Sequence, residues 1–324
     1  MNLIEILSRR AEGIPEGPHT RGLKAIVQHA QSAVRHLERG QRDHDETAFT
    51  DAIYRTNQAF EGSLKEAYRV LANQDPERVR PFDIENYFTQ QTILRQRVLD
   101  QLSVYRKEWR NPSTHDYKLD FDEDEALLAI VTVCAFAIVL FDQIAERLSF
   151  VEAQSATVTP AARDVTRPLL DAVAHALTQF RAPGSGSAPH QAREVEIVGA
   201  LAGYLSKLFP DSTVETDARL TRDRAFEVDV VLKHQSEQLI IEVKQARAGA
   251  MQRKNGINQV THYMALGGAK QGILFFYSSE DLPDYALEEH PLPGLDGRVI
   301  VVWARGRGTA QQSVAADGSA AAER

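Results

Sequence analysis

The chain has 324 residues, of which 43% are hydrophobic and 25% charged, a balance that is ordinary for a globular protein of about two domains. Its net charge of −8 argues against broad, non-specific coating of nucleic acid, although it is compatible with a local basic surface. The single cysteine, Cys134, excludes an internal disulfide framework and is expected in the reducing cytoplasm. Residues 1–17 lack the continuous apolar core of a secretory signal.

Helical periodicity dominates residues 1–180, which we predict to be an all-α bundle. Amphipathic segments predict helices at about residues 22–38, 48–71, 84–109 and 160–180. The helix 84–109 is expected to end before Asn111-Pro112, because proline disfavours helical geometry at the residue that precedes it.

A further helix is expected from an almost unbroken apolar run over residues 126–141. The run is shorter than a typical membrane span, and acidic residues lead into it. We therefore predict a buried helix rather than a membrane segment, capped by Asp120 or Asp122 and ending near Leu148.

A change of composition predicts where the two domains meet. Residues 181–193 are rich in Pro, Gly, Ser and Ala and have no apolar period, so they are predicted to form a linker. Residues 305–324 have the composition of a disordered tail. The second domain is then expected to span residues 194–304.

The second domain has the pattern of an α/β fold with a central mixed sheet flanked by helices. A helix is expected to start at residue 194, because Val198, Leu201 and Leu205 form a helical stripe. Glu194, four residues before Val198, is expected on the inward face of this helix, and Glu196 is expected elsewhere. The elements that follow are predicted to be strands near Val214 and at 226–233 and 238–245, a helix at 252–266, a strand at 272–277, a short helix near 284–289 and a strand at 298–303.

Two acidic residues and a lysine interrupt the apolar strands of this domain. Asp229 lies in the first strand of a predicted hairpin, and Glu242 and Lys244 lie in the second, two residues apart and therefore on one face. Charged groups in such strands cost free energy unless they bind something. Carboxylate oxygens are suitable ligands for a hard divalent cation such as Mg²⁺. A neighbouring lysine can orient an attacking water or stabilise the charge that develops on phosphate. The pattern predicts metal-dependent phosphodiester hydrolysis.

On these residues, the segment 194–303 resembles a PD-(D/E)XK, or restriction-endonuclease-like, domain. The family motif has an acidic residue on the first helix, Asp on the second strand and (D/E)-x-K on the third, and these positions are filled by Glu194, Asp229, Glu242 and Lys244. An E-x-K triplet alone is weak, since residues 116–118 give a D-x-K in a predicted loop. Val228 stands where the family often has proline, a departure that many members share.

The helix that follows strengthens the resemblance. Gln259 and Tyr263 are similar to the Q-x-x-x-Y element of RecB-like members and share a helical face at i, i+4. The resemblance implies Mg²⁺ or Mn²⁺ held by Asp229 and Glu242 with support from Glu194, and nucleic acid, DNA above RNA, as the substrate. It further implies that Lys244 positions the nucleophile and that Gln259 aligns the backbone.

A second, weaker motif lies in the helical half. Arg110-Asn-Pro-Ser-Thr-His115 resembles the R-x(4–6)-H motif of HEPN domains, helical bundles that often cleave RNA without metal. The resemblance implies that Arg110 holds the scissile phosphate, that His115 acts as general acid or base, and that the chain forms a homodimer, with the 126–141 helix supplying buried surface. Glu61 is a candidate acidic site residue. Arg39 and His44 give a second match of the same spacing in a polar stretch, so the motif is not specific.

Three functions remain open on the sequence. The first is a cytoplasmic metal-dependent nuclease with an associated HEPN-like domain, which the two resemblances together associate with prokaryotic anti-phage defence. The second is a metal-independent HEPN ribonuclease toxin. The third is a non-catalytic protein that binds or senses nucleic acid. Magnesium or manganese is required only by the first, and no membrane partner is expected by any of them.

Overall fold

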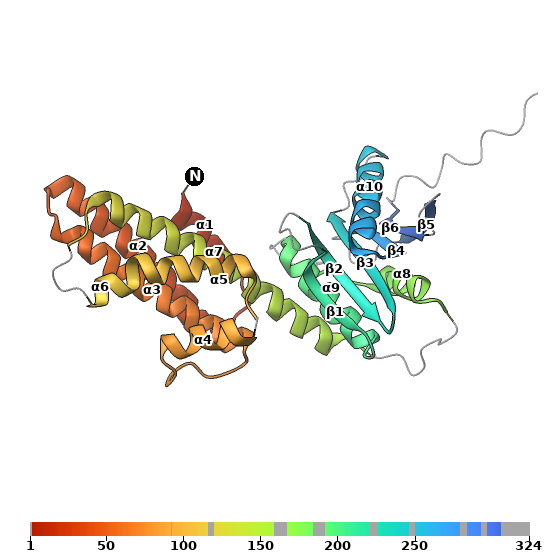
Figure 1. Ribbon diagram of the computed structural model, residues 1–324, viewed down its shortest axis with the longest axis horizontal. Helices are drawn as coiled ribbons and strands as arrows, with labels where there is room; N and C mark the ends of the chain where they lie inside the picture. The colour runs from red at the N-terminus through yellow and green to blue at the C-terminus, as the bar shows by residue number, and fades with distance from the viewer. Residues whose placement is uncertain are drawn as a thin grey trace, which may run out of the picture. The chain divides into compact units, whose positions relative to one another are not determined.

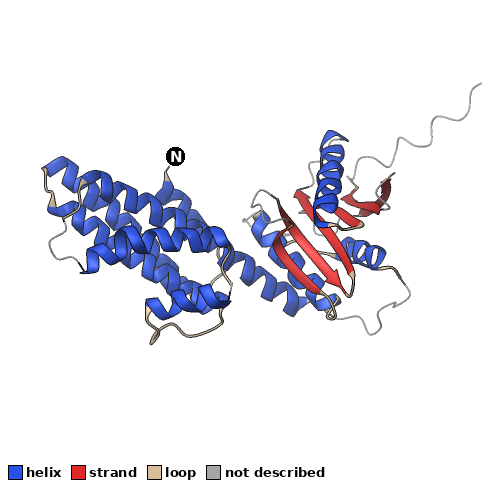
Figure 2. Ribbon diagram, viewed as in Figure 1, coloured by secondary structure: helices blue, strands red, loops and turns tan. Residues whose placement is uncertain are grey.

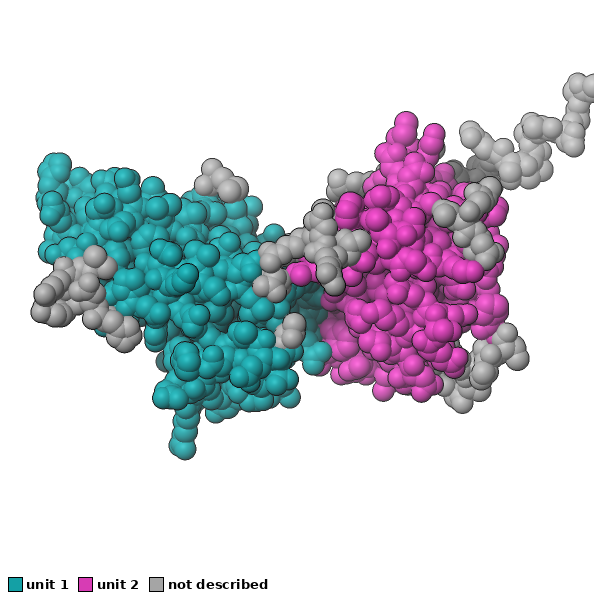
Figure 3. Space-filling view, viewed as in Figure 1, with its two compact units in different colours: residues 1–148 teal, residues 149–324 magenta. Residues whose placement is uncertain are grey.

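A computed structural model describes residues 2–91, 93–115, 120–158, 167–183, 192–220, 226–245, 250–278, 284–292 and 297–305, with the backbone alone at 96, 97, 115 and 250. The chain forms two compact units, residues 1–148 and 149–324, which Figure 3 distinguishes by colour. The first is called the helical unit and the second the sheet unit.

The described part of the helical unit contains helices and no strands (Figure 2), which confirms the predicted all-α half. The elements are α1 (Leu3–Glu12), α2 (Thr20–Asp43), α3 (Thr47–Leu71), α4 (Pro81–Gln91), α5 (Gln96–Tyr105), the π-helical turn η1 (Arg106–Arg110), α6 (Asn111–His115) and most of α7 (Glu123–Ala156). Their core is aromatic where α3, α5 and α7 meet. Phe60 lies 4.5 Å from Tyr105 and 5.2 Å from Phe136, measured between ring centroids.

The predicted single helix at 84–109 was wrong in two ways. It is divided between α4 and α5, and the helical backbone continues through Pro112 to His115. Pro112 has no N–H to donate to the turn that precedes it, so an ordinary α-helical turn could not be completed there. The turn before it widens to a π-helix, in which the Asn111 N–H bonds the carbonyl of Arg106.

Helix α7 begins as predicted with Asp122, whose Oδ1 accepts a hydrogen bond of 2.9 Å from the Glu125 N–H. It continues past Leu148 to Ala156 and is therefore longer than expected. Among the described helices it alone is long and apolar enough to span a membrane, yet 56% of its most apolar window is buried inside the protein. That burial is the behaviour of a core helix.

The sheet unit contains one mixed sheet of six strands in the order β1-β2-β3-β4-β6-β5 (Figure 1). Strands β3, β4 and β6 run parallel, and the other neighbours pair antiparallel. This confirms the α/β class at the level of a mixed sheet with flanking helices. The strands are β1 (Thr213–Arg219), β2 (Glu227–His234), β3 (Glu237–Gln245), β4 (Gln271–Tyr277), β5 (Tyr285–Leu292) and β6 (Gly297–Ala304).

One predicted element has the wrong type. The short helix expected near 284–289 is strand β5, which pairs with β6 along its whole length. Its alternation is hidden by exposed acidic residues, because β5 is an edge strand with one side open to water.

Helices cover both faces of the sheet. Helices α8 (Leu169–Gln179) and α9 (Glu194–Leu208) pack on one face in a core with Ile241 and Phe275, whereas α10 (Ala250–Gly267) packs on the other against Ile240 and Leu274. Helix α8 thus belongs to the sheet unit, although it was assigned to the helical half.

The division between the units falls at residue 148, before the predicted linker at 181–193. Residues 184–191 of that linker, and the predicted tail after 305, lie outside the described residues. The C-terminal end of α7 packs tightly on α9: a Cβ at Gly203 would lie 2.2 Å from the Phe150 carbonyl oxygen, so glycine is required at that contact.

Candidate active site

The site is located where β2 and β3 stop pairing. Their backbone register runs from His234 and Glu237 to Val230 and Ile241, one residue before Asp229 and Glu242. Beyond that point a side chain of β2 accepts a hydrogen bond from the backbone of β3: Asp229 Oδ2 accepts a hydrogen bond of 2.7 Å from the Val243 N–H. The two strands therefore separate while Asp229 stays fixed against β3.

The motif residues on β3 and α10 form one hydrogen-bonded group. Glu242 Oε1 accepts hydrogen bonds of 2.6 Å from Lys244 Nζ and of 2.7 Å from Gln259 Nε2. Gln259 also lies 3.1 Å from the hydroxyl of Tyr263, one turn further along α10. The structure thus brings together the residues of the (D/E)-x-K and Q-x-x-x-Y patterns.

Close packing of α10 on the sheet fixes Gln259 in this position. A Cβ at Gly272 of β4 would lie 2.5 Å from Cγ1 of Val260, the residue next to Gln259. Only glycine permits the helix to lie so near the strand. The packing of β4 therefore determines which residue of α10 reaches Glu242.

The carboxylates of the site carry more negative charge than their surroundings neutralise. Glu242 is 2% exposed, and its Oε2 has no hydrogen-bond partner in the described part of the chain. Burial raises the pKa of Glu242, which the hydrogen bond from Lys244 only partly offsets. Burial and the charge of Glu242 raise the pKa of Asp229 to about 7. A buried anionic oxygen without a partner is costly unless it receives a ligand.

Lys244 remains a cation in this environment. Burial opposes its charged form, but the hydrogen bond to Glu242 and the charges of Glu242 and Asp229 outweigh burial and raise its pKa. It therefore acts as a hydrogen-bond donor to Glu242 and not as a base.

Glu194 was expected on the inward face of its helix, and this was wrong. It is exposed at the first position of α9, although its charge still contributes to the raised pKa of Asp229 and of Glu242. The buried acid is instead Glu196, whose Oε2 accepts a hydrogen bond of 2.6 Å from the Arg193 N–H. An acidic residue at the third helical position is the usual signal for such a cap, and sequence reasoning overlooked it.

The donor set fits a small divalent cation. In the described residues, no group of three or more His, Cys, Asp and Glu is placed to hold a metal. Mg²⁺, however, is commonly bound by one or two carboxylates, with water and substrate phosphate completing its shell. Asp229 and the unpartnered Oε2 of Glu242 supply such a pair.

The helical unit has a separate charged cluster at the π-helical turn. Arg110 Nη2 lies 3.4 Å from Glu61 Oε1, and Arg106 Nη1 lies 3.2 Å from the buried Glu85. Burial raises the pKa of Glu85, and Arg106 opposes this. His115 ends α6, but its side chain lies outside the described residues. The expected pairing of Arg110 with His115 therefore stays a prediction.

The chain matches no known protein-family model, and comparisons with curated proteins and with solved structures likewise give no match. Its function is therefore inferred from the chemistry of its own residues.

Proposed function

We propose that the sheet unit is a metal-dependent nuclease that hydrolyses phosphodiester bonds, in DNA in preference to RNA. The observation that carries this proposal is the pair of the half-buried Asp229 and the buried Glu242, with raised pKa values and an unpartnered oxygen of Glu242 beside Lys244. In a purely structural arrangement each carboxylate would have its own cation, whereas Asp229 and Glu242 share Lys244.

Mg²⁺ or Mn²⁺ would be held by Asp229 and Glu242, with the exposed Glu194 attracting the cation from nearby. The cation supplies Lewis acidity toward phosphate oxygens and lowers the pKa of bound water. Gln259 holds Glu242 Oε1, so Oε2 is the oxygen that remains for a cation. Asp229 is held by the Val243 N–H and therefore keeps its orientation without a metal.

Lys244 is proposed to stabilise the charge that develops on phosphate. Because Lys244 is protonated and half-buried, its Nζ needs only to turn from Glu242 to a phosphate oxygen. Gln259 would then remain as the fixed donor to Glu242.

The test is incubation of the full chain with labelled duplex DNA and single-stranded RNA, each with Mg²⁺ and with EDTA. DNA cleavage that requires Mg²⁺ and is lost in Lys244→Ala supports the proposal. A Lys244→Ala protein that cleaves DNA at the wild-type rate would overturn it. Lys233→Ala, on the neighbouring strand and paired with Glu215, is the matched control.

A second candidate is a metal-independent ribonuclease centred on Arg110 and His115. The observation that favours it is the π-helical turn that holds Arg106 and Arg110 against Glu85 and Glu61, because such turns recur at functional sites. Its RNA cleavage would persist in EDTA and vanish in Arg110→Ala.

Binding of nucleic acid without cleavage under any of these conditions would instead indicate the third function, a non-catalytic sensor.

The partner that we propose is a second copy of the chain, and the surface that supports it lies on α7 of the helical unit. Leu127, Leu128 and Val131 are 47%, 56% and 40% exposed on α7, and we propose that they pair with a second copy of the chain as a homodimer in the cytoplasm. Light scattering checks this, with Leu128→Glu expected to give a monomer.

A role in anti-phage defence rests on the resemblances alone and is tested by phage challenge of cells that express the chain.

A further inference from the structure

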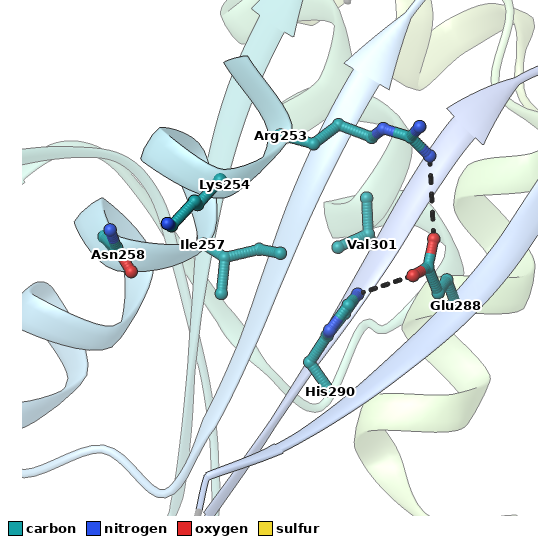
Figure 4. Close-up of a pocket in the computed structure, with 7 residues that line it drawn as sticks. All are labelled: Arg253, Lys254, Ile257, Asn258, Glu288, His290 and Val301. Atoms are coloured by element: carbon teal, nitrogen blue, oxygen red, sulfur yellow. Dashed lines mark ion pairs between the residues drawn. The ribbon is translucent and has the colours of Figure 1, made fainter. Parts of the chain in front are cut away.

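The sheet unit contains a cavity of about 380 Å³ (Figure 4). Its volume is in the range of small-molecule sites. One wall is α10 and the other is formed by β5 and β6; the lining residues are Arg253, Lys254, Ile257, Asn258, Glu288, His290 and Val301.

The register of the parallel strands places this cavity relative to the site. Glu242 of β3 is aligned with Leu274 of β4, and Leu274 is aligned with Val301 of β6. Aligned residues of neighbouring strands face the same side, and Leu274 and Val301 both pack under α10. Val301 therefore lies on the face of Glu242, two strands and about 10 Å away.

The same helix serves both places. Gln259 contacts Glu242, whereas Arg253 and Asn258 of α10 reach the cavity. Gln259 lies six positions after Arg253, which is about 9 Å along a helix axis. A strand bound at both places would therefore span about 9 Å, the length of a few nucleotides.

The lining has the chemistry of a nucleotide site. Arg253 and Lys254 are cations suited to a phosphate. Arg253 is held in place, since its guanidinium carbon lies 4.9 Å from the Trp303 ring centroid and its Nη1 lies 3.7 Å from Glu288. The amide of Asn258 offers a donor and an acceptor to a base edge, beside the apolar side chains of Ile257 and Val301.

We propose that this cavity binds one nucleotide of the DNA strand that is cleaved, a few steps from the scissile phosphate. Arg253 and Lys254 hold the phosphate, while Asn258 faces the base. The proposal rests on the nuclease function proposed above. It assigns the cavity to a strand and not to a free nucleotide.

Binding is measured by fluorescence anisotropy of a short labelled single-stranded DNA on full-length protein carrying Asp229→Asn, in EDTA so that cleavage cannot occur. Arg253→Ala and Lys254→Ala are each expected to weaken binding about tenfold and to reduce the slope of log affinity against log salt by about 0.7. Asn255→Ala, an exposed amide on α10 that does not line the cavity, is the matched control for Asn258→Ala. Arg253→Lys keeps the charge without the planar fork and tests whether any loss arises from misfolding.

Equal affinities for Arg253→Ala, Lys254→Ala and Asn255→Ala would overturn the proposal, even if the wild type cleaves DNA. Binding that depends on Arg253 in a protein that never cleaves would support the cavity and reject the nuclease function. A deoxynucleoside monophosphate that competes as tightly as the strand would overturn the assignment to a strand.

Discussion

Three buried carboxylates in the described part of the helical unit are each paired with an arginine, in the pairs Glu66–Arg69, Glu85–Arg106 and Glu146–Arg95. In the sheet unit, Asp229 and Glu242 share Lys244 and have the charge of Glu194 nearby. Burial of an acidic group therefore does not by itself mark a site. What distinguishes the sheet unit is that two carboxylates share one cation, whereas each of these carboxylates in the helical unit has an arginine of its own.

The largest effect is expected from neutralising the unpartnered carboxylate. Glu242→Gln keeps an oxygen for Lys244 but removes the negative charge, so nuclease activity should fall about a thousandfold or more. Single-turnover cleavage of DNA in Mg²⁺ measures it. Glu237→Gln, exposed at the other end of β3, should cleave at the wild-type rate. Full activity in Glu242→Gln would remove the distinction between the two units.

Breaking a compensated pair should change stability rather than activity. Arg106→Ala leaves Glu85 buried without its arginine, and we expect a loss of about 3 kcal/mol in the free energy of unfolding at neutral pH. Urea denaturation measures it, and DNA cleavage per folded molecule should be unchanged. Lys107→Ala, at the exposed neighbouring position, is the control.

Neutralising Asp229 should raise the free energy of unfolding, whereas Arg106→Ala should lower it. Its pKa is raised to about 7, so the folded chain binds this proton more tightly than the unfolded chain does. The stability that this group contributes is therefore complete below about pH 4 and is lost as pH rises through about 7. Asp229→Asn avoids that loss. Its free energy of unfolding at pH 8 should therefore be about 2 kcal/mol higher than that of the wild type. Urea denaturation of Asp229→Asn and wild type measures this at both pH values. A stabilisation by Asp229→Asn that is no larger at pH 8 than at pH 4 would contradict the prediction.

The smallest effect concerns the pH dependence of metal binding. Asp229 must lose its proton to bind a cation, and its pKa is about 7. Mn²⁺ affinity should therefore fall about tenfold for each pH unit below 7 and level off above it. Isothermal calorimetry at several pH values measures this. A pH-independent affinity between pH 5 and 7, both within about two units of that pKa, would show that Asp229 is not a ligand.

Much of the site could be predicted because its residues are local in sequence. A hairpin brings Asp229 near Glu242, alternation puts Lys244 beside Glu242, and helical spacing joins Gln259 to Tyr263. The position of Glu194 could not be predicted in this way. Its helix has apolar residues on several sides, so periodicity alone did not reveal which acid turns inward.

The fold was predicted least well where long-range packing decides the structure. Helix α8 was placed with the helical half because it follows α7 in sequence, yet its apolar face is buried with Phe275 of β4. Strand β5 depends on its pairing with β6, and no local preference reveals that partner. The cavity beside the site combines α10, β5 and β6, and so it is visible only once the strand order is known.

The buried Cys134 gives the helical unit a reporter of its own. It is the single thiol of the chain, it is fully buried in the aromatic core, and burial raises its pKa to about 12. A thiol reagent can therefore modify the chain only when that core opens, since the reactive species is the exposed thiolate. Labelling kinetics consequently follow the opening of one unit while the other still binds its ligand, so the coupling between the two can be measured without adding a probe.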